Sequence, residues 1–193
     1  MNVYDFDRTI YNGDSTVDFY LFCMWRHKRI LLLLPSLLFA YIKYYLFNIG
    51  TKTEFKESMY KFLKFCNAET DVADFWKEHI SKIKHWYLEQ RKDDDVIISA
   101  SPEFLLNPCG KEIGFTVIAS KVCSKSGKYD GENCYYNEKV NRFFQLYPDS
   151  VIDEFYSDHY SDEPLANISK KAFIVDKDTI IPWDFNKHIK PHI

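Results

Sequence analysis

Short apolar runs alternate with helix-like segments at both ends of the chain. Continuous runs of three to five apolar residues are typical of strands that are buried on both faces of a parallel sheet. Most of the spacers between the later runs have the apolar spacing of helices. The pattern therefore predicts an α/β fold with a parallel sheet. Its strands are expected at residues 2–4, 96–98, 115–119, 154–156 and 172–175, and its crossover helices at 102–113, 137–147 and 162–170.

Residues 13–90 follow a different pattern, in which apolar residues recur every three or four positions, as in Phe55, Met59 and Phe62. This spacing predicts a helical insertion directly after the first strand, and Asp14 is well placed to cap its first helix. We therefore expect a sheet domain made of residues 1–12 and 91–193 and a helical domain made of residues 13–90. A hairpin is predicted at 124–133, where Gly127 and Gly131 provide turn residues.

One segment of the insertion, residues 30–47, reads ILLLLPSLLFAYIKYYLF. It approaches the apolar length that a membrane span needs, but Pro35, Ser36 and Lys43 interrupt it. We interpret it as a pair of helices packed inside the insertion, with Pro35 near a boundary. A basic cluster at 26–29 precedes it, so the alternative is peripheral membrane contact through residues 26–47.

Composition and charge indicate which classes of protein this chain can belong to. The chain is 46% hydrophobic and 27% charged, as in folded soluble proteins. A net charge of -3 gives no electrostatic footprint for nucleic acid, which we exclude as a partner. Five cysteines without a Cys-x-x-Cys pair argue against a disulfide framework and a zinc ribbon. With an acidic motif at residue 5 we expect no secretory signal and a cytoplasmic location, or one peripheral to the inner face of the membrane.

Polar residues gather where the predicted strands end. Asp5 and Asp7 follow the first strand, Ser99 follows the second, and Asp158 follows the fourth. In parallel α/β sheets, function gathers beyond these carboxyl ends. Each residue also has an ordinary interpretation: a solvated loop, a strand-end serine or a helix cap. Asp162 and the helix lysine Lys139 likewise have ordinary roles when taken singly.

Together these residues form a recognisable series. DFDRT, VIISAS, NEKV and YSDHYSD resemble, in this order, the four motifs of the haloacid dehalogenase superfamily. The match covers residues 1–12 and about 91–185, and the insertion resembles the helical cap of the phosphoserine phosphatase-like branch. The resemblance implies a Rossmann-like core, with a parallel sheet flanked by helices and a helical cap inserted after the first strand. The segment LLLLPSLLFAYIKYYL is also similar, in composition, to the cap of phosphatidylglycerophosphatase C.

The same resemblance implies a mechanism, that of a Mg²⁺-dependent phosphatase with an aspartyl-phosphate intermediate. Asp5 would attack phosphorus, and Asp7 would protonate the leaving alcohol and then deprotonate water. Ser99 and Lys139 would hold the phosphoryl oxygens. Mg²⁺ would be bound by Asp5, by the backbone carbonyl of Asp7 and by Asp158, while Asp162 would orient water or Lys139.

The substrate implied is a small phosphorylated metabolite resembling phosphoserine. Asp14 and Arg26 are the candidates for cap residues that select it, and Arg8 either reaches substrate or lies on the surface. Two alternatives stay open: a membrane-associated phosphatase of lipid head groups, and a non-catalytic binding module with the same fold. The sequence indicates no oligomeric state.

Overall fold

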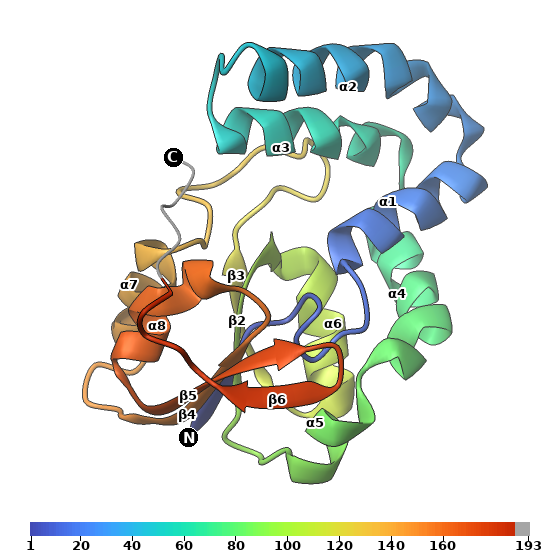
Figure 1. Cartoon of the computed structure of the whole chain (residues 1–193). Helices are drawn as coiled ribbons and strands as arrows, with labels where there is room; N and C mark the ends of the chain where they lie inside the picture. The colour runs from blue at the N-terminus through green and yellow to red at the C-terminus, as the bar shows by residue number, and fades with distance from the viewer. Residues whose placement is uncertain (188–193) are drawn as a thin grey trace.

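A six-stranded sheet forms the centre of the protein in this computed structural model, which describes residues 1–187 (Figure 1). The strands lie in the order β3-β2-β1-β4-β5-β6. The first five are parallel, and β6 pairs antiparallel with β5. Their bounds are β1 (Asn2–Tyr4), β2 (Val96–Pro102), β3 (Thr116–Ser120), β4 (Ile152–Ser157), β5 (Ser169–Asp176) and β6 (Thr179–Pro182). This confirms the predicted α/β fold with a largely parallel sheet and adds one strand, β6, to the expected set.

Helices cover both faces of the sheet (Figure 1). The helix α6 (Glu103–Ile113) packs on β2 and β3, while α7 (Asn137–Leu146) and α8 (Glu163–Asn167) lie on the opposite face. The sheet has a hydrophobic core on each face, and neighbouring residues of β1 point into different ones. Val3 packs in the core that includes α7 and α8, and Tyr4 packs in the core that includes α6. Every residue of β1 is buried, as expected of a central strand between two helical layers.

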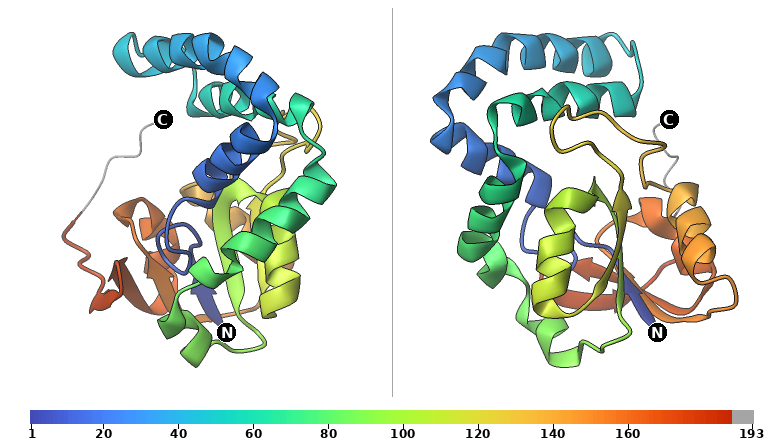
Figure 2. Two further views of the ribbon diagram at one scale, coloured as in Figure 1. Left: turned by 90° about the vertical axis from the view of Figure 1, so that its right-hand side faces the viewer. Right: turned by 180° about the vertical axis from the view of Figure 1, so that it is seen from behind.

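Five α-helices and several short turns of other helix types lie between β1 and β2. The carboxylate of Asp14 accepts a hydrogen bond from the Val17 amide, so it caps the first helix as predicted. Figure 2 shows α4 and α5 beside the sheet domain, whereas α2 and α3 project beyond the carboxyl ends of the strands. The helices are α1 (Ser15–Arg26), α2 (Leu34–Tyr41), α3 (Lys52–Tyr60), α4 (Ala68–His79) and α5 (His85–Gln90).

The apolar segment is the clearest departure from expectation. Helical turns run without a break from Lys28 to Leu46, with a mean hydropathy of 1.4 and only 6% of the stretch buried. Every residue of α2 is partly or fully exposed, and Leu32 and Phe39 are 76% and 69% exposed. The expectation of helices packed inside the insertion is therefore wrong, although Pro35 does lie in the first turn of α2. By length and composition alone, this stretch could also cross a membrane.

The predicted hairpin at 124–133 is reduced to one antiparallel bridge, between Val122 and Tyr129. Gly127 turns the chain there with a φ of 74°, in the left-handed region that favours glycine. A Cβ at this position would lie 2.6 Å from the Tyr60 carbonyl oxygen. Backbone hydrogen bonds from Cys123 to Lys128 and from Asp130 to Lys121 close this short hairpin, which also packs against the end of α3.

Candidate active site

A pocket of about 440 Å³ opens at the carboxyl edge of the sheet and is lined on one side by residues of α3. Its walls come from the turns after β1 and β4, from the end of β2, from the start of α7, and from α1 and α3. All six residues that the sequence proposes for a site line this one pocket: Asp5, Asp7, Ser99, Lys139, Asp158 and Asp162.

A sharp turn after β1 lets both motif aspartates reach the pocket. The strand ends at Tyr4, and the amides of Ile10 and Tyr11 both donate back to the Phe6 carbonyl. Arg8 sits in this turn with a φ of 58°, and its own carbonyl accepts a hydrogen bond of 2.6 Å from Lys84 Nζ. The Arg8 side chain lies at the pocket rim, with 68% of its surface exposed. Because alternate residues of an extended chain share a face, the Asp-x-Asp spacing puts both carboxylates on one side of the chain, and the turn ends the strand there.

Lys139 occupies the floor of the pocket between two carboxylates. Its Nζ donates to Asp5 Oδ1 and to Asp162 Oδ2, each at 2.7 Å, and the residue is only 2% exposed. The Ser157 hydroxyl also donates to Asp162 Oδ2, at 2.8 Å. Burial alone would lower the pKa of Lys139, but Asp162 and Asp5 outweigh it and raise that pKa. The lysine is therefore a fixed positive charge directly beside Asp5.

The carboxylates around Asp5 carry more negative charge than the ammonium of Lys139 can neutralise. Burial raises its pKa, Lys139 opposes the rise, and repulsion from Asp162 and Asp158 adds to it. The pKa of Asp158 is raised as well, first by burial and then by Asp162. A divalent cation that prefers oxygen ligands would relieve this surplus of negative charge. The donor set thus fits Mg²⁺.

Asp7 has different neighbours, which donate neutral hydrogen bonds. The Ser101 hydroxyl donates to Asp7 Oδ2 at 2.5 Å, and the Ser15 amide donates to Oδ1 at 2.6 Å. Burial, with some repulsion from Asp14, raises the pKa of Asp7 to about 6 against the opposing effect of these hydrogen bonds. A carboxyl with this pKa can exchange a proton near neutral pH.

Ser101 and Thr9 are parts of the site that the sequence reasoning missed. The Thr9 hydroxyl accepts from the Asp158 amide at 2.9 Å and lies 3.4 Å from Asp5 Oδ2, so it links the ends of β1 and β4. Ser99 is almost fully buried, and its hydroxyl accepts from the Ser101 amide at 3.1 Å. The Ser-x-Ser spacing at the end of a strand was the available signal for Ser101, because alternate residues share a face.

The insertion contributes residues to the pocket mouth, but only one of the two that were expected. Asp14 lines the pocket. Arg26 instead pairs with Asp71 and Asp74 on α4, so the expectation that it contacts substrate is wrong. The cation that the insertion does bring to the pocket is Lys56 of α3, whose Nζ donates to the Ala100 carbonyl at 3.1 Å. No sequence signal separated it from the other lysines of the insertion.

Comparisons with known proteins identify the family and the fold. The family model of haloacid dehalogenase-like hydrolases matches residues 3–167. A search of curated protein sequences finds no match.

Solved structures share the fold at low sequence identity. A protein of unknown function from Bordetella pertussis Tohama I has a TM-score of 0.69 at 18% identity, over 89% of this chain and 87% of that one. A phosphoserine phosphohydrolase-like protein from Francisella tularensis subsp. tularensis SCHU S4 has a TM-score of 0.53 at 15% identity, over 89% and 86%. Cytosolic 5'-nucleotidase IIIB bound to cytidine has a TM-score of 0.57 at 13% identity, over 88% and 69%. At these identities the likeness is one of fold.

Proposed function

The chain belongs to the haloacid dehalogenase-like hydrolase family, and we propose that it is a Mg²⁺-dependent phosphomonoester hydrolase that acts through an aspartyl-phosphate intermediate. The observation that carries this proposal is the pairing of Asp5 with the buried ammonium of Lys139 at 2.7 Å in a pocket that also contains Asp7. A carboxylate nucleophile, a fixed positive charge and a separate proton donor are the groups that this reaction requires.

The chemistry follows from the positions of these side chains. An oxygen of Asp5 attacks phosphorus, and the bond from phosphorus to the alcohol oxygen breaks while Asp7 gives that oxygen its proton. Asp7 then takes a proton from a water molecule that attacks the acyl phosphate, which releases phosphate and restores Asp5. Lys139 and Ser99 hold phosphoryl oxygens throughout, and groups of this kind each contribute roughly 3 to 4 kcal/mol to the transition state.

The metal fits the acidic side of the pocket. Asp5, Asp158 and the backbone carbonyl of Asp7 would hold Mg²⁺, and Asp162 would keep Lys139 in place. When bound, the ion supplies positive charge that offsets the repulsion between the phosphate and these carboxylates.

We assign substrate selection to the insertion, residues 13–90, acting as a cap. Asp14 and Lys56 bring opposite charges to the pocket mouth. A small metabolite that carries an ammonium and a carboxylate beside its phosphate would match both. The fold likeness to a phosphoserine phosphohydrolase-like protein supports a substrate of this phosphoserine-like kind.

The central test is Asp5→Asn, measured as Mg²⁺-dependent release of phosphate from an aryl phosphate. We expect no turnover while circular dichroism stays unchanged, whereas Asp153→Asn, at an exposed ion pair outside the pocket, should retain activity. Full activity of the Asp5 variant would overturn the proposal.

A second assay separates an enzyme from a non-catalytic module of the same fold. Beryllium fluoride with Mg²⁺ mimics a phosphoryl group on a competent carboxylate, so it should raise the melting temperature of the wild type but not of Asp5→Asn. The same lack of response in the wild type would favour the binding module.

One observation favours a second candidate function, hydrolysis of a phosphorylated lipid head group at the inner face of the membrane. The helical stretch Lys28–Leu46 exposes a large apolar surface, and its residue Tyr45 also lines the pocket. Lys28, Arg29 and Lys43 provide the positive charge that attracts anionic lipids. A helix of this kind binds with its apolar face in the head-group region, which would bring the pocket mouth close to the lipid surface.

Co-sedimentation with anionic and zwitterionic vesicles tests this candidate. The wild type should sediment with anionic vesicles, and replacing Leu38 and Phe39 by Glu should abolish this without changing hydrolysis of a soluble phosphate. Leu146→Glu, at an exposed apolar position on α7, is the matched control and should still bind. Failure of the wild type to bind would remove the lipid candidate and leave the soluble substrate in place.

A further inference from the structure

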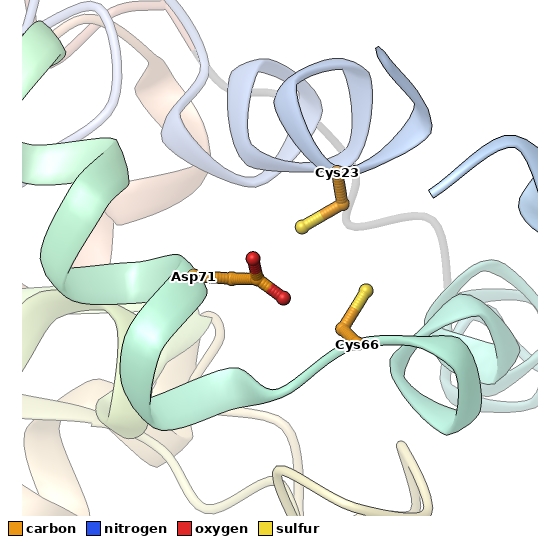
Figure 3. Close-up of side chains that lie close together, drawn as sticks. All are labelled: Cys23, Cys66 and Asp71. Carbon is orange, nitrogen blue, oxygen red and sulfur yellow. The ribbon is translucent and has the colours of Figure 1, made fainter. Parts of the chain in front are cut away.

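Two cysteines and an aspartate converge outside the catalytic pocket, where α1 meets the start of α4 (Figure 3). Cys23 lies on α1, Cys66 ends the short helical turn Lys61–Phe65, and Asp71 lies in the first turns of α4. Their two sulfur atoms and a carboxylate oxygen all lie within 4.8 Å of one another. Cys23 and Asp71 are buried and Cys66 is partly exposed, so the cluster is enclosed but has an entry path.

A fourth donor lies beside this cluster. His27 closes the C-terminal end of α1, and its Nε2 is 2.8 Å from Asp71 Oδ2. Because His27 follows Cys23 by four residues, the two side chains leave α1 on the same face. The imidazole is 31% exposed, and it therefore forms the solvent side of the cluster.

We propose that Cys23, Cys66, Asp71 and His27 form a structural site for Zn²⁺. Two sulfurs, one imidazole and one carboxylate are ligands that tetrahedral zinc sites use, whereas Mg²⁺ takes oxygen ligands and so selects the catalytic pocket instead. With Zn–S bonds of about 2.3 Å, a tetrahedral site places two sulfurs roughly 3.8 Å apart. The two sulfurs and a carboxylate oxygen of Asp71 lie at most 4.8 Å apart, which is close enough for side-chain rotation to bring these three ligands onto one ion, and His27 adjoins them through its contact with Asp71.

The surroundings balance the charge of such a site. Zn²⁺ with two thiolates and one carboxylate carries a net charge of -1, and Arg26 Nε lies 3.4 Å from Asp71 Oδ1. The Asn67 amide donates to Asp71 Oδ2 at 2.9 Å and fixes the orientation of the carboxylate. Groups that orient a ligand in this way are a regular part of metal sites.

The position of the site gives the metal a structural role. It would join the end of α1 to α4, and α4 is anchored on the sheet domain by the 2.6 Å hydrogen bond from Trp76 Nε1 to the Leu105 carbonyl. The projecting part of the insertion, α2 and α3, lies between α1 and α4 in the chain, so it begins and ends near this junction (Figure 1). Zinc would therefore fix the base of the segment that covers the pocket without entering the chemistry.

Titration of the reduced full-length protein with Co²⁺ tests the proposal, because cobalt bound to thiolates gives a charge-transfer absorption. We expect one bound ion per chain, displaced by Zn²⁺, and a rise in melting temperature with Zn²⁺. Cys66→Ser should weaken binding by more than about 100-fold, beyond the ~10–100-fold that loss of an outer partner costs. Cys66 is chosen because its partial exposure makes the serine tolerable.

Two controls isolate the site. Cys123→Ser, at an exposed cysteine elsewhere in the chain, should bind the metal like the wild type. Asp5→Asn should also bind it, because the catalytic pocket is separate. Absence of the charge-transfer band in the reduced wild type would overturn the proposal, and so would its survival in Cys66→Ser. A Cys23–Cys66 disulfide in protein purified with Zn²⁺ present would overturn it as well.

Discussion

Ser101→Ala should move the pH dependence of the proposed reaction in a direction that the structure specifies. The Ser101 hydroxyl is buried and donates to Asp7 Oδ2 at 2.5 Å, which favours the ionised carboxylate. Hydrogen bonds to charged groups are worth about 1.5 to 3 kcal/mol. Since one pKa unit corresponds to about 1.4 kcal/mol, loss of the hydroxyl should raise the pKa of Asp7 from about 6 to roughly 7 to 8.

The sign of the effect on turnover follows from the role of Asp7 as the acid. The leaving oxygen needs the protonated carboxyl, so kcat/KM for an alkyl phosphate should fall as pH rises through the pKa of Asp7. In Ser101→Ala this fall should occur at higher pH than in the wild type. The second ionisation of the substrate, near pH 6, affects both proteins equally and cancels in the comparison.

Two measurements keep this prediction specific. Ser161→Ala removes another hydroxyl from the pocket wall and should leave the alkaline limb unchanged. An aryl phosphate with a stable leaving anion needs little protonation, so its kcat/KM should show a much weaker alkaline limb in every variant. An alkaline limb that stays in place in a folded Ser101→Ala protein, with the alkyl substrate, would refute the assignment of Asp7 as the acid.

Three further substitutions test other parts of the structure. Lys139→Met leaves two buried carboxylates without their ammonium partner and should lower the unfolding free energy by about 3 to 5 kcal/mol near neutral pH, as measured by denaturant titration. This loss of stability should become smaller as the pH falls and the carboxylates protonate, and a loss that stays constant with pH would contradict the prediction. Trp76→Phe removes the indole hydrogen bond to the Leu105 carbonyl and part of a buried side chain, and should cost about 1 to 3 kcal/mol, whereas exposed Trp25→Phe should cost under about 0.5 kcal/mol. Lys56→Gln should raise KM for phosphoserine about tenfold with kcat unchanged, unlike exposed Lys64→Gln, and an equal effect of both would remove Lys56 from the substrate site.

The sheet and the ends of its strands could be predicted because they depend on short-range patterns. A buried parallel strand is a short apolar run, and the first polar residue after it must lie at the carboxyl edge. This rule places Asp5, Ser99 and Asp158 at one edge, and the structure brings them to one pocket. The ends of β2 and β3 were harder to predict. Pro102 and Ser120 pair with each other after a register shift, so β2 continues past the point where its apolar run ends.

The features that the sequence did not predict depend on contacts between distant segments. The loop after β3 packs against Tyr60, so Gly127 marks a close approach between segments, and the pairing of the predicted hairpin is limited to the bridge between Val122 and Tyr129. The stretch Lys28–Leu46 has the composition of a core helix, but nothing in its pattern tells whether another element covers it. Among the described residues it lies at the outside of the fold, and the pattern alone could not distinguish that from burial.

The division of labour between the two motif aspartates is likewise a product of the fold. Asp5 and Asp7 belong to one short motif, and their chemistry is set by residues that the fold brings to each. Burial and repulsion from Asp162 and Asp158 raise the pKa of Asp5, and the positive charge of Lys139 opposes that rise, as a bound Mg²⁺ would. Asp7 receives only neutral hydrogen bonds, from Ser101 and from an amide of α1, so burial can hold its proton until the leaving group needs it.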